Sequence, residues 1–161
     1  MVVRVKVTDA DVQRGTLAVP EIAAEVVPIP IIGETLTLTY QRPDGGKGTL
    51  SDFRGKFTVV HYWASWCTPC KQQLPALRQV QEKFAARGLA TVGLSVDTDD
   101  ASWQSVLKKL NLPWPQGRLA AAGESGVSTV PAYWLLDPSG KIVAKVYDPD
   151  ELAKQIADRI K

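Results

Sequence analysis

The sequence predicts an α/β fold, with a mixed central sheet whose middle strands are parallel and whose faces are covered by helices. Two short apolar runs, residues 57–63 and 89–96, have the composition of strands buried on both faces. Between them, residues 71–87 place Leu74, Leu77, Val80 and Phe84 on one helical stripe. A strand, helix and strand of these lengths form a right-handed unit with parallel strands.

Further strands and a second helix are expected on either side of this unit. Residues 35–40 alternate threonine with apolar residues and predict a strand, and residues 47–50 return as its partner after a turn at 43–46. Acidic residues at 97–100 are expected to cap a helix over 101–110, which a strand-like piece follows. A short helix is expected at 120–124.

The C-terminal part of the chain predicts a hairpin and a last helix. Strands at 132–136 and 141–147 are joined by residues 137–140, a connection short enough for an antiparallel hairpin at one edge of the sheet. The last helix is expected to start at Asp150.

The chain is expected to divide into an appended β-rich segment, residues 1–31, and one globular domain, residues 32–161. Alternating valines at 3–7 and the run 15–19 predict short strands, and prolines at 20, 28 and 30 prevent a long element from following them. The 161 residues, 45% of them hydrophobic and 22% charged, are enough for one domain with a full core.

Charge and hydropathy exclude some classes of partner. A net charge of +2 with scattered basic residues gives no sign of a nucleic-acid partner. The chain has no apolar run of the ~18 residues that a membrane span needs, and its start does not have the pattern of a signal peptide.

Both cysteines of the chain lie in Trp66-Cys67-Thr68-Pro69-Cys70, where a predicted strand ends and a predicted helix begins. The N–H groups of a first helical turn and the helix dipole stabilise a thiolate at that place, so Cys67 is the candidate nucleophile. The spacing holds the Cys70 thiol within reach, as thiol–disulfide exchange requires. Pro69 stiffens the intervening pair, and Thr68 can help set the hydrogen bonding of the thiolate.

Other uses of the two cysteines are a stabilising disulfide, a metal site and an incidental pair in an interaction domain. A ring of four residues gives only ~2 kcal/mol in the loop-entropy account, the least a disulfide can contribute. His61 is the one histidine in the chain, which argues against a four-ligand zinc site, so no metal-binding residue is assigned. A soft Cu(I) ion held by the two thiolates, as in a metallochaperone, remains the alternative function.

Three stretches carry a resemblance to a known family. The run from Trp63 to Lys71 with Pro75 after it, the pair Val130-Pro131, and residues 50–56 resemble thioredoxin-like proteins of the extracytoplasmic branch typified by TlpA and ResA. The resemblance covers roughly residues 32–161. It implies a thioredoxin fold with an N-terminal β-hairpin and a central helix–strand insertion.

The resemblance also implies an activity, thiol–disulfide oxidoreduction on partner proteins. Cys67 would attack, Cys70 would resolve the mixed disulfide, and the redox-active disulfide itself would serve in place of a cofactor. The expected partners are a protein disulfide, typically apocytochrome c in this branch, and a thiol electron donor. A monomer in the periplasm or cell envelope is expected, with a cytoplasmic protein as the alternative.

The resemblance implies substrate-contacting positions as well. In the family a cis-proline loop lies against the two cysteines and pairs with the substrate chain, which places Thr129, Val130 and Pro131 at the substrate. Trp66 beside Cys67 would form an apolar platform for the partner. Thr68 and Pro69 complete this set.

Two positions depart from the family pattern. Thioredoxins carry a buried acid six residues before the first cysteine, and His61 stands there; the ResA type carries a glutamate three residues after the second cysteine, and Gln73 stands there. His61 is therefore the candidate base that takes the proton from Cys70, because a free imidazole titrates near pH ~6.5. The alternative is a neutral histidine of the core.

Overall fold

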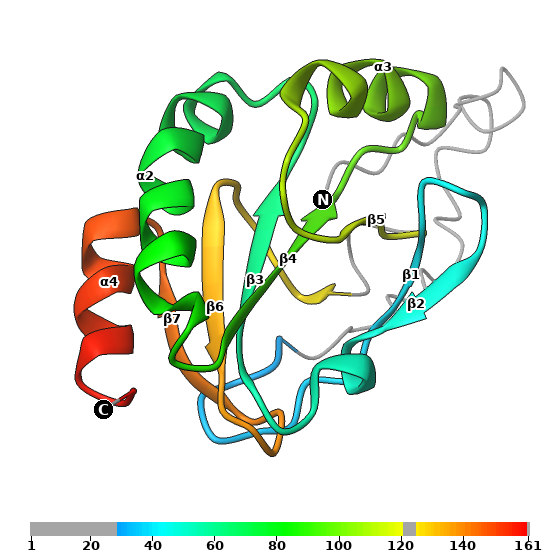
Figure 1. Cartoon of the computed structure of the whole chain (residues 1–161). Coiled ribbons are helices and arrows are strands. Elements are labelled where there is room, and N and C mark those ends of the chain that lie inside the picture. The colour runs from blue at the N-terminus through cyan, green and yellow to red at the C-terminus, as the bar shows by residue number, and fades with distance from the viewer. Residues whose placement is uncertain (1–28, 121–124, 161) are drawn as a thin grey trace, which may run out of the picture.

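The computed structural model describes residues 29–120 and 125–160, and within them seven strands and three α-helices are found. The strands are β1 (Thr39–Gln41), β2 (Lys47–Thr49), β3 (Phe57–Trp63), β4 (Leu89–Ser95), β5 (Gln116–Arg118), β6 (Ala132–Leu136) and β7 (Ile142–Val146). The helices are the 3-10 helix η1 (Leu50–Phe53) and the α-helices α2 (Thr68–Ala85), α3 (Asp100–Leu110) and α4 (Pro149–Ala157). The strands form one mixed sheet in the order β2-β1-β5-β4-β3-β6-β7 (Figure 1).

The centre of the sheet is the predicted strand–helix–strand unit. β3 and β4 pair in parallel along their whole length, from Phe57 opposite Leu89 to Trp63 opposite Ser95. β3 pairs on its other side with the antiparallel β6. The predicted central strands are confirmed, and β3 is buried on both faces as its apolar composition indicated.

Both predicted hairpins are confirmed at the edges of the sheet. β1 and β2 pair antiparallel at one edge, and β6 and β7 pair antiparallel at the other. The piece after α3 forms β5, which pairs in parallel with β4 and antiparallel with β1. The helix–strand insertion therefore connects the N-terminal hairpin to the central strands.

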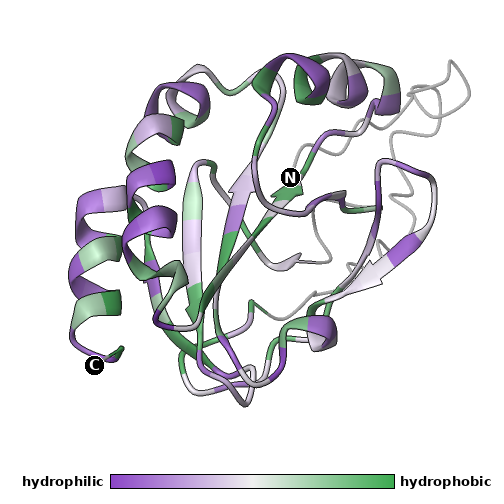
Figure 2. Ribbon diagram, viewed as in Figure 1, coloured by the Kyte–Doolittle hydropathy of each residue, from purple (hydrophilic) through white to green (hydrophobic). Residues whose placement is uncertain are grey.

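The two faces of the sheet are covered in different ways. α2 and α4 lie side by side on one face and bury their apolar residues there, and hydrophilic and hydrophobic residues alternate along both (Figure 2). Among the described residues, the core of the opposite face takes no residue from an α-helix; η1 and extended segments cover it. The expectation of helices on both faces thus holds only through the short 3-10 helix.

The strand predicted at 35–40 is wrong over most of its length. Only its end belongs to β1, because the preceding residues pair with the far edge of the sheet instead. The Leu36 N–H donates to the Gly140 carbonyl at 3.0 Å, and the Gly33 N–H donates to the Ile142 carbonyl at 2.8 Å. This segment therefore crosses the sheet from one edge to the other, on the face opposite α2 and α4.

The predicted helix boundaries shift by a few residues. α2 begins three residues earlier than predicted and ends at Ala85, before Gly88, whose positive φ of 89° lies beyond the helix. α3 is capped by Asp99, and α4 by Asp148 rather than by Asp150. The strands predicted near residues 3–7 and 15–19, and nearly all of the short helix at 120–124, lie outside the described residues.

Candidate active site

Cys67 and Cys70 form a disulfide at the start of α2, with Cα atoms 5.3 Å apart. Cys67 is the N-cap residue of the helix, and its sulfur accepts a hydrogen bond from the Cys70 N–H at 3.2 Å. Both cysteines are buried, whereas Thr68 and Pro69 between them are exposed. The end of β3 and the first turn of α2 thus place a sulfur where helix N–H groups stabilise negative charge.

The disulfide lies over a small apolar cluster at the carboxyl ends of β3 and β4. Its buried members are Trp63, Ala64, Cys67, Cys70 and Trp103. Trp103 comes from α3, so the helix–strand insertion forms one wall of the site. Val130 packs against the same cluster, which brings the loop before β6 to the disulfide.

The peptide bond between Val130 and Pro131 is cis. Beside this loop is a hollow of about 310 Å³, lined by Trp66, Val96, Val127, Ser128, Thr129 and Val130. Trp66 is 68% exposed. Three of the predicted substrate-contacting residues, Trp66, Thr129 and Val130, are therefore brought to one hollow, and Pro131 adjoins it in the chain.

His61 lies wholly buried in β3, on the face that α2 and α4 cover. It stacks on Tyr133 of β6, the residue opposite it in the sheet, with ring centroids 5.0 Å apart. The Tyr133 hydroxyl in turn donates to Gln73 Oε1 at 2.8 Å. Neither ring nitrogen of His61 has a hydrogen-bond partner among the described residues.

Burial lowers the pKa of His61 from its ordinary value of 6.5 to about 3. The imidazole is therefore neutral near pH ~7, and it does not supply the positive charge that would favour a neighbouring thiolate. Its role as a base for Cys70 remains a prediction. Sequence reasoning did not find Tyr133, because its contact with His61 arises only when β3 and β6 pair.

The depressed pKa of His61 predicts a loss of stability in acid. Between pH 6.5 and about 3 the unfolded chain binds a proton that the folded chain does not, so the free energy of unfolding falls as the pH falls through this range. A loss of about 2–3 kcal/mol is expected between pH ~7 and pH ~4.5. Urea unfolding of the wild type and His61→Phe at both pH values measures it. An equal loss in the two proteins would show that His61 does not cause it.

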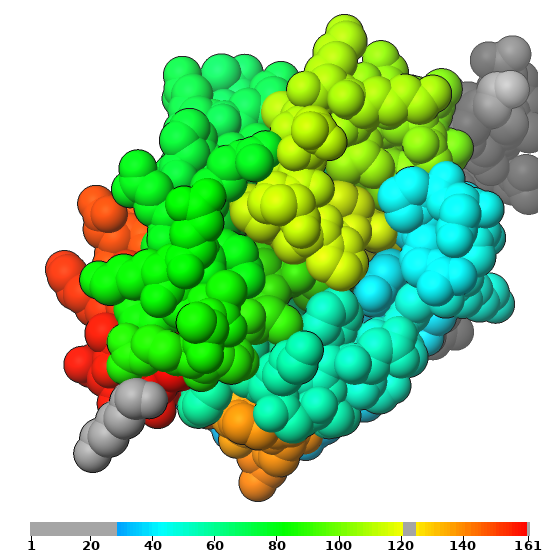
Figure 3. All heavy atoms as spheres, in the orientation of Figure 1, coloured from blue at the N-terminus to red at the C-terminus, as the bar shows by residue number. Residues whose placement is uncertain are grey.

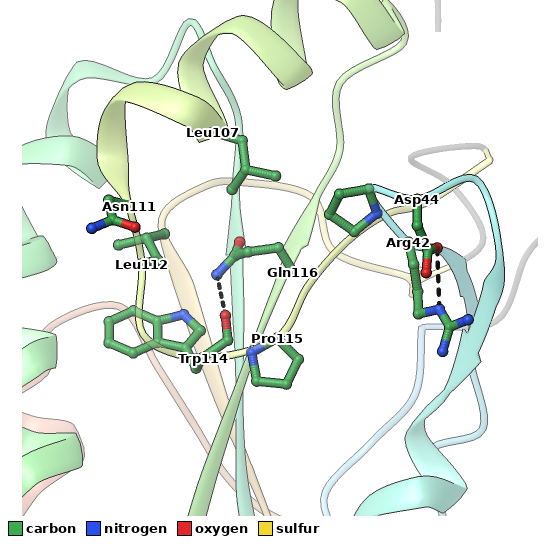
Figure 4. A pocket seen from close by; sticks show the side chains of 9 residues that line it. Arg42, Asp44, Leu107, Asn111, Leu112, Trp114, Pro115 and Gln116 are labelled. Atoms are coloured by element: carbon green, nitrogen blue, oxygen red, sulfur yellow. Dashed lines mark hydrogen bonds and ion pairs between the residues drawn. The ribbon is translucent and has the colours of Figure 1, made fainter.

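A larger pocket of about 490 Å³ lies between the end of α3, the start of β5 and the turn between β1 and β2 (Figure 4). Two polar contacts join its lining residues: the Gln116 amide donates to the Trp114 carbonyl, and Arg42 pairs with Asp44. None of its lining residues belongs to the disulfide turn or the cis-proline loop. In Figure 3 the segment after α3 fills the surface between α2 and the N-terminal hairpin. Pocket size therefore does not locate the chemistry, which lies at the disulfide.

The fold and sequence of this chain have counterparts among known proteins. The model of the AhpC/TSA family matches residues 32–145. The chain belongs to the AhpC/TSA family.

One named relative of this AhpC/TSA chain is a thiol–disulfide oxidoreductase. The ResA thiol–disulfide oxidoreductase of Bacillus thuringiensis subsp. konkukian is 28% identical over 107 residues, which are 64% of this chain and 61% of the relative. This chain thus spans less than two thirds of that relative's length.

Two solved structures share the fold. The thioredoxin domain of a thiol–disulfide oxidoreductase from Bacteroides vulgatus is 25% identical, with a TM-score of 0.73, over 81% of this chain and 99% of that one. A thiol:disulfide interchange protein from a Bacteroides species is 25% identical, with a TM-score of 0.71, over 81% and 91% of the two chains. The predicted thioredoxin fold is confirmed.

Proposed function

We propose that this chain exchanges thiols and disulfides with partner proteins through Cys67 and Cys70. The observation that supports this most is the position of the disulfide, with the Cys67 sulfur capping α2 and accepting the Cys70 N–H. An exposed tryptophan and a cis-proline loop lie beside it. A disulfide that served only to stabilise the fold would need none of these neighbours.

The reaction proceeds in two exchanges. The Cys67 thiolate attacks one sulfur of a partner disulfide, that S–S bond breaks, and the other partner sulfur leaves as a thiolate and takes up a proton. Cys70 then loses its proton and attacks the Cys67 sulfur, which releases the second partner sulfur. The partner is reduced and the chain is oxidised to the Cys67–Cys70 disulfide. A thiol donor reduces this disulfide again, and no cofactor is needed.

The partner binds along the hollow beside the disulfide. We assign Trp66, Thr129 and Val130 to its walls, Pro131 to the adjoining loop, and Thr68 and Pro69 to the exposed rim between the cysteines. A partner strand would pair with the backbone before Pro131 and place an apolar side chain in the hollow. A protein disulfide is therefore the proposed substrate class. We further propose that this chain acts as a monomer outside the cytoplasm.

The copper alternative gains no support. The relative and the two solved structures named above are thiol–disulfide oxidoreductases or interchange proteins, and none of the three is named for copper. Among the described residues, no helix is both long enough and apolar enough to cross a bilayer.

Insulin reduction by dithiothreitol tests the proposed function directly. The wild-type chain should accelerate the reduction well above the uncatalysed rate, and the double variant Cys67→Ser/Cys70→Ser should not. Equal rates with and without the wild-type chain would reject the proposal.

His61 is the proposed acceptor of the Cys70 proton. Its pKa of about 3 makes the neutral imidazole a weak base for this role. His61→Phe keeps the bulk of the ring and removes the base. Resolution of a preformed mixed disulfide should then slow most near pH ~7, where free hydroxide is scarce. An unchanged pH–rate profile in the folded variant would show that His61 is a neutral histidine of the core and not the base.

A further inference from the structure

Asp97 is a buried carboxylate whose bonds reach the loop before Cys67. It is 4% exposed and follows the end of β4. Its Oδ2 accepts the Ser65 N–H at 2.8 Å and the Ser95 hydroxyl at 2.6 Å, and its Oδ1 accepts the Ser65 hydroxyl at 2.8 Å. A buried carboxylate is stable only when it is satisfied in this way, so these bonds hold its position firmly.

Ser65 is fixed by all of its polar groups. Besides its two bonds to Asp97, its carbonyl accepts a hydrogen bond from the Lys71 Nζ at 3.1 Å. Lys71 lies in the first turns of α2, next to Cys70. The residue two positions before the nucleophile is thus tied both to the end of β4 and to the helix that carries the disulfide.

The same contacts set the walls of the substrate hollow. Trp66 follows Ser65, and Val96 lies between Ser95 and Asp97; both line the hollow beside the disulfide. The Val96 N–H also donates to the Trp63 carbonyl at 2.9 Å. Asp97 thus connects the strand end that carries Val96 to the segment that carries Trp66 and Cys67.

We propose that Asp97 is a positioning residue that fixes, through Ser65, both the Cys67 sulfur and the Trp66 wall of the substrate hollow. This inference rests on the proposed thiol–disulfide exchange. Asp97 touches neither sulfur in the proposed reaction, and it acts only by holding the turn. Small displacements of a reacting group lower rates steeply, so the effect should be large for a partner that fills the hollow.

Two substitutions separate geometry from charge. Asp97→Ala leaves the Ser65 N–H without its buried acceptor. Asp97→Asn can keep all three bonds, because its oxygen replaces Oδ2 and its amide group donates to the Ser65 hydroxyl, which can accept. Asp158→Ala, at an exposed carboxylate that ends α4, is the matched control.

The experiment measures kcat and KM for insulin and for the small disulfide cystine. Asp97→Ala should lower kcat/KM for insulin roughly tenfold, through a lower kcat from the displaced Cys67 sulfur and a higher KM from the displaced Trp66 wall, and lower it less for cystine, which does not fill the hollow. Asp97→Asn should recover most of the loss. If Asp97 served only to stabilise the fold, Asp97→Ala would lower kcat/KM for both substrates by the same factor, set by the folded fraction. Amide exchange at the Ser65 N–H should be fast in the alanine variant and slow in the asparagine variant.

Several outcomes overturn the inference. They are a wild-type kcat/KM for insulin in folded Asp97→Ala, equal losses for the two substrates, or asparagine as harmful as alanine. Where Asp97→Ala does not fold, Ser65→Ala removes one of the three bonds, and a wild-type KM there overturns it equally. A wild-type chain inactive on insulin would instead reject the proposed function, which keeps the two failures distinct.

Discussion

Cys67→Ser should lose insulin reduction entirely, down to the uncatalysed rate. A serine hydroxyl does not ionise near neutral pH, so the first bond to a partner sulfur cannot form. The substitution replaces one sulfur atom by oxygen at a buried N-cap position, and serine is a good N-cap residue, so the helix start is preserved. Activity is measured by insulin turnover with dithiothreitol, and folding by far-UV circular dichroism.

The matched control for this prediction is the wild-type chain with its disulfide reduced. It lacks the cross-link, as the serine variant does, and yet it should remain active. A folded Cys67→Ser protein that still reduced insulin would assign the nucleophile to another residue.

Among the substitutions considered, Trp103→Ala should give the largest loss in the free energy of unfolding. Trp103 is fully buried, and it packs against Trp63 and the two cysteines. Truncation of a buried tryptophan typically costs ~3–5 kcal/mol, because the neighbours close the void only in part. The void here adjoins the disulfide, so the loss should come with a looser site. Urea unfolding at pH ~7 measures the free energy.

Trp66→Ala is the control for the Trp103 prediction. Trp66 is 68% exposed, so its truncation should change the free energy of unfolding by about 0.5 kcal/mol or less. Equal losses in the two variants would contradict the placement of Trp103 in the cluster under the cysteines.

Local periodicity was enough to predict the centre of this fold. β3 and β4 each follow from a short apolar run and α2 from a regular stripe of apolar residues, and the spacing of the cysteines located the site. The prediction for the segment before β1 was wrong, because alternation indicates an extended chain but does not specify the strand with which it pairs. Its partner, near Gly140, lies at the opposite edge of the sheet.

The finer structure of the site depends on contacts between residues distant in sequence. Asp97 was expected to help cap α3, but Asp99 does so, and Asp97 turns to Ser65, 32 positions earlier. One of three aspartates in the stretch after a strand gives no local sign of that contact. The stacking of His61 on Tyr133 likewise follows from strand pairing, which short-range patterns do not specify.

The most direct test of the central claim is a trapped mixed disulfide in Cys70→Ser. Without the resolving thiol, the exchange should stop after the first step, with the partner held on Cys67. Peptide mapping by mass spectrometry, after incubation of the reduced variant with insulin, should find insulin cysteine joined to Cys67. Recovery of the variant with a free Cys67 and no insulin adduct, under conditions where the wild type turns over, would contradict the account.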